Sequence, residues 1–171
     1  MLIIRRLDTS HDRDGFDCGV KPLNEYLSKT ARQHSEKGLA NTFVLLDEAA
    51  QHTILGFFTL SFLEVDVTAL PSAHAKRLPK NFRLPAAKLA RLAVDQRCQG
   101  KGYGAVLLAD AVKRIVATVS ESGGIVGFFV DAKDKQAQQY YLRFGFIPLK
   151  DTPLTLFLPL ATLMQGIKKT L

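Results

Sequence analysis

The spacing of hydrophobic residues divides the first half of the chain into strands and one helix. Segments 2–7, 41–48 and 53–67 are predicted to be strands, because they are short apolar runs bounded by polar or turn-forming residues. A short polar turn between the last two predicts an antiparallel hairpin. Pro22 suits the first turn of a helix, and helical spacing continues to about Ser35.

In the second half of the chain, strand-like and helix-like spacings of hydrophobic residues alternate more regularly. Segments 86–95, 125–132, 146–150 and 155–160 are predicted strands, and segments 103–119 and 133–144 are predicted helices. Residues 71–85 form a basic, proline-punctuated connection, and the last eleven residues are a short helix or a frayed end. The element order β-α-β-β-β-α-β-α-β-β predicts an α/β fold (α+β) with a mainly antiparallel first half.

Length and composition indicate which broad class of protein this is. With 171 residues, 47% of them hydrophobic, the chain is predicted to be one globular domain covering residues 1–171. No apolar run approaches the length of a membrane span, which is about 20 residues, and two arginines interrupt the start, so we expect a cytoplasmic protein without a membrane partner. Cys18 and Cys98 stand far apart without a ligand pattern, which predicts neither a disulfide framework nor a metal site.

Charged residues are unevenly distributed along the chain. The formal net charge is +7, and Asp95 is the only acidic residue between Lys76 and Lys101, a stretch with eight Lys and Arg residues. Such an imbalance favours a surface that binds an anion, either a nucleic acid or a phosphorylated cofactor.

A glycine loop, residues 99–104, stands between a predicted strand and the long helix. Gly100, Gly102 and Gly104 allow close approach of the backbone, and the helix offers N–H groups and a positive dipole end, so the loop is predicted to hold a pyrophosphate. No Gly-Lys-Ser/Thr follows, which excludes a Walker A loop. Several antiparallel strands come first, and this order argues against a Rossmann unit.

The chain resembles the GNAT acetyltransferases in two sequence motifs. Their acetyl-CoA signature, Gln/Arg-x-x-Gly-x-Gly/Ala, is matched by Gln99, Gly102 and Gly104, and also by the frame that starts at Arg97. Their last motif is matched by Tyr141-x-x-x-Gly145-Phe146. The stretches "FDCGVKPLNEYLSKTARQ", "LARLAVD", "VDAKD" and "YLRFGF" are similar to the GNAT toxins of bacterial toxin–antitoxin pairs.

The resemblance implies a fold, a cofactor and partners. We expect a single mixed, mostly antiparallel sheet flanked by helices, with a splayed cleft for acetyl-CoA. The acceptor implied is the amino group of aminoacyl-tRNA, whose acetylation blocks translation. A small ribbon-helix-helix antitoxin and a homodimer are the further implied partners. The residues themselves leave open an enzyme for a small amine, a lysine or a protein N-terminus, and a non-catalytic module that binds acetyl-CoA or nucleic acid.

The resemblance also assigns residues to the cofactor. The backbone of Leu92 and Val94 would line the pantetheine arm, with the Val94 N–H facing the thioester carbonyl. Asp134 stands where many GNATs carry an asparagine that touches this arm, although an aspartate there also suits a helix cap. The complete expected set is Leu92, Ala93, Val94, Arg97, Gln99, Gly100, Lys101, Gly102, Tyr103, Gly104 and Asp134.

Tyr141 is the predicted catalytic acid. A phenol has a pKa of about 10 and stays protonated at neutral pH, so it can protonate the departing thiolate. Tyr140 and Tyr141 project to different sides of their helix, and the family spacing to Gly145 selects Tyr141, which leaves Tyr140 as a packing residue. No general base is evident: Glu64, Asp66, water or a backbone carbonyl could accept the proton.

Basic residues are predicted to bind the phosphates of the acceptor without reading its sequence. Arg91 could instead pair with a carboxylate or contact CoA. Phe82 and Tyr26 could stack on a terminal base, or be buried. The predicted acceptor set is Lys29, Arg32, Lys37, Arg77, Lys80, Arg83 and Arg91.

Overall fold

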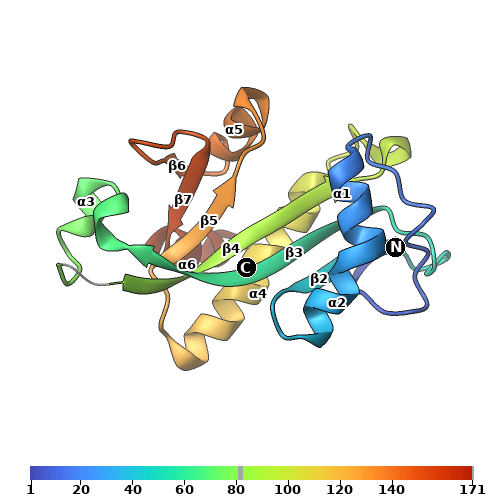
Figure 1. Ribbon diagram of the computed structural model, residues 1–171, viewed down its shortest axis with the longest axis horizontal. Coiled ribbons are helices and arrows are strands. Elements are labelled where there is room, and N and C mark those ends of the chain that lie inside the picture. Colours follow the sequence, from blue (N-terminus) through green and yellow to red (C-terminus); the bar gives the residue numbers. More distant parts are fainter. Residues whose placement is uncertain (81–82, 171) are drawn as a thin grey trace. The chain divides into compact units, whose positions relative to one another are not determined.

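The computed structural model describes residues 1–80 and 83–170, apart from the side chains of residues 122 and 166–170. The chain forms two compact units, one built from residues 1–61 and 90–112 and the other from residues 62–89 and from 113 onward. Strands β3 (Gly56–Asp66) and β4 (Arg83–Val94) and helix α4 (Tyr103–Ser122) each begin in one unit and end in the other (Figure 1).

The first unit is built on an antiparallel sheet. Strand β1 (Leu2–Arg6) pairs with β2 (Asn41–Asp47), and β2 pairs with β3 from Asn41↔Leu60 to Leu45↔Gly56. The predicted hairpin is therefore confirmed. The strand predicted at 53–67 begins three residues later, at Gly56, and just before it the Leu55 N–H donates to the Leu45 carbonyl at 2.9 Å.

A helical segment follows the N-terminal loop in the first unit. It comprises α1 (Lys21–Glu25), a π-helical turn (Tyr26–Thr30) and α2 (Ala31–Glu36), with Pro22 in the first turn as predicted. In the π turn the Ala31 N–H bonds the Tyr26 carbonyl, five residues back, so the segment holds one residue more than a regular helix would. Apolar periodicity predicted the helix but not this insertion. Beneath the segment lies a core that includes Leu27, Ile54 and Phe57.

The second unit carries the parallel part of the sheet. Strand β4 pairs in parallel with β5 (Gly127–Asp131) over Ala87–Leu89, with α4 as the crossover between them. Strand β5 pairs antiparallel with β7 (Thr155–Pro159), which pairs with the short β6 (Ile147–Pro148). The strand order is β1-β2-β3-β4-β5-β7-β6, so the sheet is mixed and mostly antiparallel, in agreement with the predicted fold class.

Three further helices belong to the second unit: α3 (Ser72–Ala75), α5 (Lys135–Leu142) and α6 (Leu160–Thr170). Helix α3 lies inside the basic, proline-punctuated connection of residues 71–85, and α6 takes up the tail, which was predicted to be helical or frayed. A buried cluster that includes Ala86, Phe129, Leu149 and Phe157 forms the core of this unit. Within the described residues, no helix combines the length and the apolar character that crossing a membrane requires.

Gly127 provides a test of the packing between β5 and β7. A Cβ atom at Gly127 would collide with the Phe157 ring and would lie 2.5 Å from the Leu158 carbonyl oxygen, which belongs to the sheet and cannot rotate away. We expect Gly127→Ala to lower the free energy of unfolding by about 1–3 kcal/mol in urea denaturation.

The matched control is Gly15→Ala, where the colliding atoms belong to the flexible carboxylate of Asp12. This substitution is expected to cost clearly less than Gly127→Ala. Equal losses from the two variants would contradict the packing explanation.

Candidate active site

The glycine loop connects β4 to α4, as the sequence predicts. After β4 the chain makes a 3₁₀ turn, Gln96–Cys98, and α4 begins at Tyr103. Gly100 and Gly102 have φ angles of 82° and 81°, in the left-handed region that favours glycine. A Cβ atom at either position would meet nothing within 4 Å, so the loop backbone is open on that side.

The features of the loop fit a diphosphate. Helix α4 is 20 residues long, and the first N–H groups of any helix lack partners within the helix and carry its positive dipole end. The Lys101 side chain is exposed beside it. Tyr103 and Gly104 form the first turn of α4. Free backbone donors, a positive dipole end and an exposed lysine are the features that the predicted binding of a diphosphate requires.

Arg97, which is predicted to contact the cofactor, forms an ion pair with Asp95. Its Nε and NH2 atoms donate to the two carboxylate oxygens of Asp95 at 2.8 and 3.0 Å. The Asp95 side chain is only 2% exposed, and the hydrogen bonds from Arg97 lower the pKa of that carboxyl group. The Arg97 side chain itself is 63% exposed, so the guanidinium is paired with Asp95 and still faces solvent.

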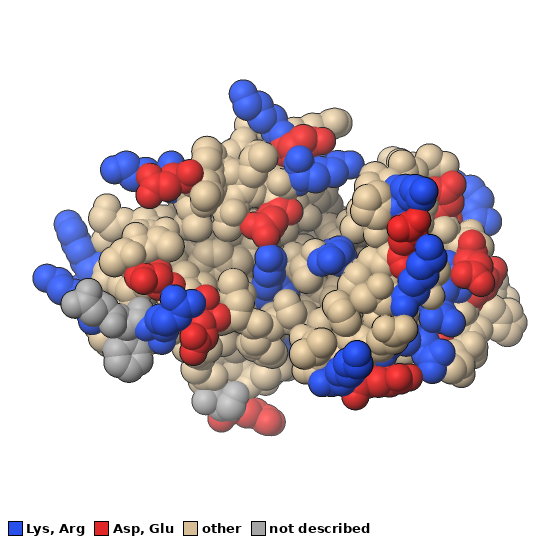
Figure 2. All heavy atoms as spheres, in the orientation of Figure 1, with Lys and Arg blue, Asp and Glu red and all other residues tan. Residues whose placement is uncertain are grey.

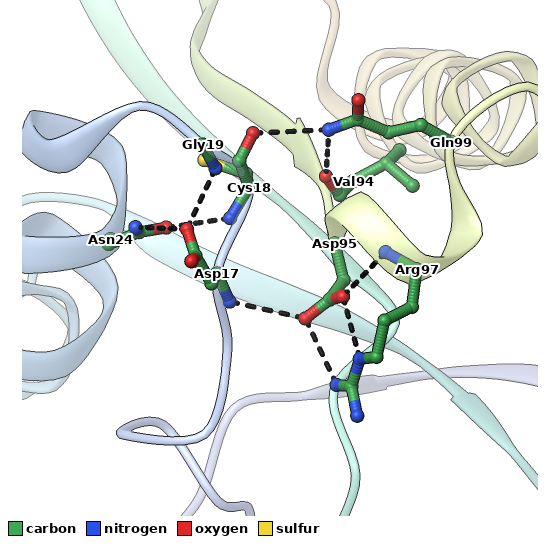
Figure 3. A network of polar contacts seen from close by, with 8 residues as sticks. All are labelled: Asp17, Cys18, Gly19, Asn24, Val94, Asp95, Arg97 and Gln99. Carbon is green, nitrogen blue, oxygen red and sulfur yellow. Dashed lines mark hydrogen bonds and ion pairs between the residues drawn. The ribbon is translucent and has the colours of Figure 1, made fainter.

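Gln99 also has partners within the chain. Its Nε2 atom donates to the carbonyl oxygens of Cys18 at 3.1 Å and of Val94 at 2.9 Å (Figure 3). The side chain therefore ties the start of the loop to the end of β4 and to the N-terminal segment. Sequence reasoning missed this role, together with the polar network around Asp17, Asn24 and Asp95. The only signals were the Asp-x-Arg spacing and the conspicuous "FDCG" stretch.

At the end of β4, side-chain burial alternates from residue to residue, as expected for a strand. Ala93 is buried in the core of the first unit, while Leu92 and Val94 are half-buried and point to the opposite face of the strand. The side chains of Leu92 and Val94 thus lie on the same face of β4. Their predicted role toward the cofactor concerns backbone groups and stays a prediction.

Tyr141 lies in the second unit within an aromatic cluster. Its ring meets those of Tyr140 and Phe146 edge-on, with centroids 5.5 and 5.6 Å apart. The residue is 8% exposed, and burial raises the pKa of its phenol well above the ordinary value. Among the described residues no buried side-chain oxygen or nitrogen lacks a hydrogen-bond partner.

Tyr140 is a packing residue, as the sequence predicts, although it lies at the edge of the cluster and not in a fully buried core. It is half-buried, its ring packs against Phe144 with centroids 5.1 Å apart, and the Arg143 guanidinium lies 5.4 Å from its centroid. The more buried member of the pair is Tyr141.

The carboxylates considered for the site have structural partners. Asp134 caps α5 by accepting the Ala137 N–H at 2.8 Å, which is the alternative role noted for it. Glu64 pairs with Arg83 at 3.1 Å, and Asp66 accepts the N–H and hydroxyl of Thr68. Among the described residues no group of His, Cys, Asp and Glu side chains could hold a metal ion.

The predicted acceptor residues are divided between the units. In the first unit Lys29 and Arg32 form helical ion pairs with Glu25 and Glu36, and the side chain of Lys37 is exposed. Arg77, Lys80 and Arg83 are exposed in the second unit. Figure 2 shows that basic side chains on the visible face are interspersed with acidic ones.

Arg91, in the first unit, packs against an aromatic ring. Its guanidinium carbon lies 4.3 Å from the centroid of the Tyr26 ring, a cation–π geometry. Tyr26 is buried, the second of the two roles considered for it. Phe82, the other stacking candidate, lies outside the described residues.

Comparison with known proteins identifies the class. A family model described as an acetyltransferase (GNAT) domain matches residues 38–148. A probable toxin TacT of Sinorhizobium fredii is 31% identical, over 94% of this chain and 92% of the relative. A tRNA-acetylating toxin of Mycobacterium tuberculosis is 31% identical, over 90% and 89%. The chain belongs to the GNAT acetyltransferase family.

Solved structures agree over nearly the whole chain. AtaT complexed with acetyl-methionyl-tRNAfMet has a TM-score of 0.87 at 30% identity, covering 99% of both chains. AtaTR bound with AcCoA has a TM-score of 0.83 at 30% identity, covering 97% and 98%. A mutant AtaT toxin bound to the C-terminus of the antitoxin AtaR has a TM-score of 0.80 at 29% identity, covering 99% and 98%. The protein is an N-acetyltransferase that uses acetyl-CoA.

Tyr141 can be tested by removing its hydroxyl. We expect Tyr141→Phe to lower kcat by about 10²–10⁴-fold while leaving the Kd for acetyl-CoA within about twofold, because general acid catalysis contributes on that scale. Burial favours the neutral phenol, so in the wild type this acid is kept as the pH rises, and kcat should show no loss of it below about pH 10.

Tyr140→Phe is the matched control, because it removes a hydroxyl from the adjacent ring of the same cluster. It is expected to change kcat less than about threefold. A comparable loss in both variants would mean that the cluster, rather than the Tyr141 hydroxyl, supports turnover.

Proposed function

We propose that this chain transfers the acetyl group of acetyl-CoA to the α-amino group of an aminoacyl-tRNA and blocks translation as the toxin of a toxin–antitoxin pair. The observation that carries the proposal is the likeness to AtaT complexed with acetyl-methionyl-tRNAfMet, which covers 99% of both chains and so includes the N-terminal segments outside the family model. The relative from M. tuberculosis, a tRNA-acetylating toxin, supports the same acceptor.

The donor contributes an activated acetyl group with a thiolate leaving group. The first task of the chain is to hold the diphosphate of this donor, which we assign to the backbone of residues 99–104 and to Lys101. The second is to stabilise the negative charge that develops on the thioester carbonyl oxygen, which we assign to the Val94 N–H. Tyr141 performs the third by donating its phenolic proton to the sulfur.

The nature of the acceptor explains why no dedicated base is needed. An α-amino group has a pKa of about 8, and the neighbouring ester of a charged tRNA lowers it further. A substantial fraction of the amine is therefore neutral at pH 7 and ready to attack. Glu64 and Asp66 already bond Arg83 and Thr68, which leaves water or a backbone carbonyl to accept the proton.

The proposed acceptor and the similar proteins suggest the partners of this chain and its location in the cell. AtaT has been seen with the C-terminus of its antitoxin AtaR, and we propose that a small ribbon-helix-helix antitoxin neutralises this chain in the same manner. We further propose a homodimer of single-domain subunits covering residues 1–171. Charged tRNA is a cytoplasmic substrate, so the cytoplasm is the proposed location.

The acceptor can be identified by incubating the protein with labelled acetyl-CoA and charged total tRNA. We expect label in the aminoacyl fraction, released when the aminoacyl ester is hydrolysed. Uncharged tRNA is the control and should stay unlabelled, because its amino acid is missing. Label in polyamines, peptides or lysines, with none in the aminoacyl fraction, would overturn the proposed acceptor while leaving the acetyltransferase class intact.

The phosphate-binding role of the basic residues predicts a salt effect. Lys37→Ala is expected to weaken binding of all tRNAs to a similar degree and to reduce the slope of log Kd against log salt by about one, as loss of one phosphate contact does. Lys113, an exposed lysine of α4 outside the predicted set, provides the matched control Lys113→Ala, which should leave the slope unchanged. Equal slopes for the two variants would remove Lys37 from the acceptor surface.

A further inference from the structure

An N-terminal clasp, residues 17–19, lies against the turn that leads into the glycine loop (Figure 3). The Asp17 N–H donates to Oδ2 of Asp95 at 3.1 Å, and the Gln96 N–H donates to the Asp17 carbonyl at 2.8 Å. Two backbone segments about eighty residues apart are thus joined by hydrogen bonds in both directions.

The other residues of the clasp make the contact continuous. The Cys18 carbonyl accepts a hydrogen bond from Gln99, the first residue of the glycine loop, at 3.1 Å. Gly19 has a φ angle of 84°, and a Cβ atom there would lie 2.5 Å from Nε2 of Gln96. Glycine at this position allows the clasp to approach the turn so closely.

Asn24 of α1 fixes the shape of the clasp. Its Nδ2 atom donates to Oδ1 of Asp17 at 2.9 Å, and its Oδ1 atom accepts the Cys18 N–H at 2.9 Å. Oδ1 of Asp17 also accepts the Gly19 N–H at 2.8 Å, and these bonds lower the pKa of Asp17. The clasp is therefore anchored to a helix and does not hang freely.

Asp95 makes the junction costly to open. Its side chain is almost fully buried and accepts from the Arg97 N–H and guanidinium as well as from Asp17. A buried carboxylate that loses a donor keeps its desolvation cost without the compensating bond. Movement of the clasp would expose Asp95 to this cost.

The loop itself needs such an anchor. Gly100 and Gly102 have no neighbours within 4 Å of a Cβ position, so packing does not order them, and glycine loses more backbone freedom on ordering than any other residue. Order has to come from the two ends of the loop. Helix α4 supplies one end, and the Asp95–Gln99 turn held by the clasp supplies the other.

We infer that the clasp pre-organises the glycine loop for the diphosphate of acetyl-CoA, and that Asn24, Asp95 and Gln99 are positioning residues for the cofactor. Binding to an ordered loop avoids the entropic cost of ordering it, which raises affinity. The inference concerns the cofactor alone, so its main readout, the Kd for CoA, needs no acceptor and does not depend on the tRNA proposal.

Gln99→Glu tests the link between the loop and the clasp. It replaces a donor with a carboxylate that faces two carbonyl oxygens, so the junction should open. Calorimetric titration with CoA at pH 7.5 is expected to give a Kd raised about fivefold or more, with a stoichiometry near one. Gln51→Glu is the matched control, because the Gln51 amide also donates to a backbone carbonyl, that of Glu48, away from the loop; its Kd should equal that of the wild type.

Asn24→Leu separates positioning from direct contact. It removes both side-chain bonds to the clasp and leaves every residue of the glycine loop unchanged. We expect a raised Kd for CoA and, in assays with saturating acceptor, a raised KM for acetyl-CoA with kcat within about twofold. If Gln99→Glu weakens CoA while Asn24→Leu does not, Gln99 acts by touching CoA itself and the clasp mechanism is wrong.

Thermal melting of each variant separates positioning from a purely structural role. Titrations are made at least 15 degrees below each measured Tm, where the protein is folded. A lower Tm with an unchanged Kd and KM in both variants would show that the network only stabilises the fold, and would overturn the inference.

Discussion

The Asp95 carboxylate, which is 2% exposed, accepts hydrogen bonds from Asp17 and from Arg97 and so joins the N-terminal segment to the turn before the glycine loop. Its charge is tolerable only while Asp17 and Arg97 both reach it, since a buried charge without partners is strongly unfavourable. The N-terminal segment, the end of β4 and the start of the glycine loop therefore form as one structure. We infer that this junction, and not a core of its own, orders the exposed loop.

The chemistry of the protein is distributed over regular elements. The loop is held between a strand end and the first turn of a 20-residue helix, and Tyr141 belongs to a short helix packed on aromatic rings. Burial raises the pKa of the phenol, so it stays protonated near neutral pH, where the α-amino group of the proposed acceptor is already partly neutral. In the proposed mechanism the fold thus supplies the acid, and the low basicity of the acceptor amine removes the need for a strong base.

Sequence patterns revealed those parts that depend on local periodicity or fixed spacing. The strands, the long helix and the glycine loop between β4 and α4 belong to this group, while the choice of Tyr141 over Tyr140 as the acid stays a prediction. The π turn at Tyr26–Thr30 escaped prediction because one inserted residue hardly disturbs an apolar pattern. Arg97 and Gln99 were assigned to the cofactor, and the partners that occupy their side chains stayed hidden. For Gln99 one partner lies 81 residues away, beyond the reach of any local pattern.

The two compact units are interleaved along the chain, since residues 1–61 and 90–112 form one and the intervening and following residues form the other. Three elements, β3, β4 and α4, pass from one unit to the other. No single cut in the chain can release either unit whole. The unit that carries the glycine loop and the unit that carries Tyr141 must therefore be inherited together. Recombination between related genes at a single point would divide at least one of the two units.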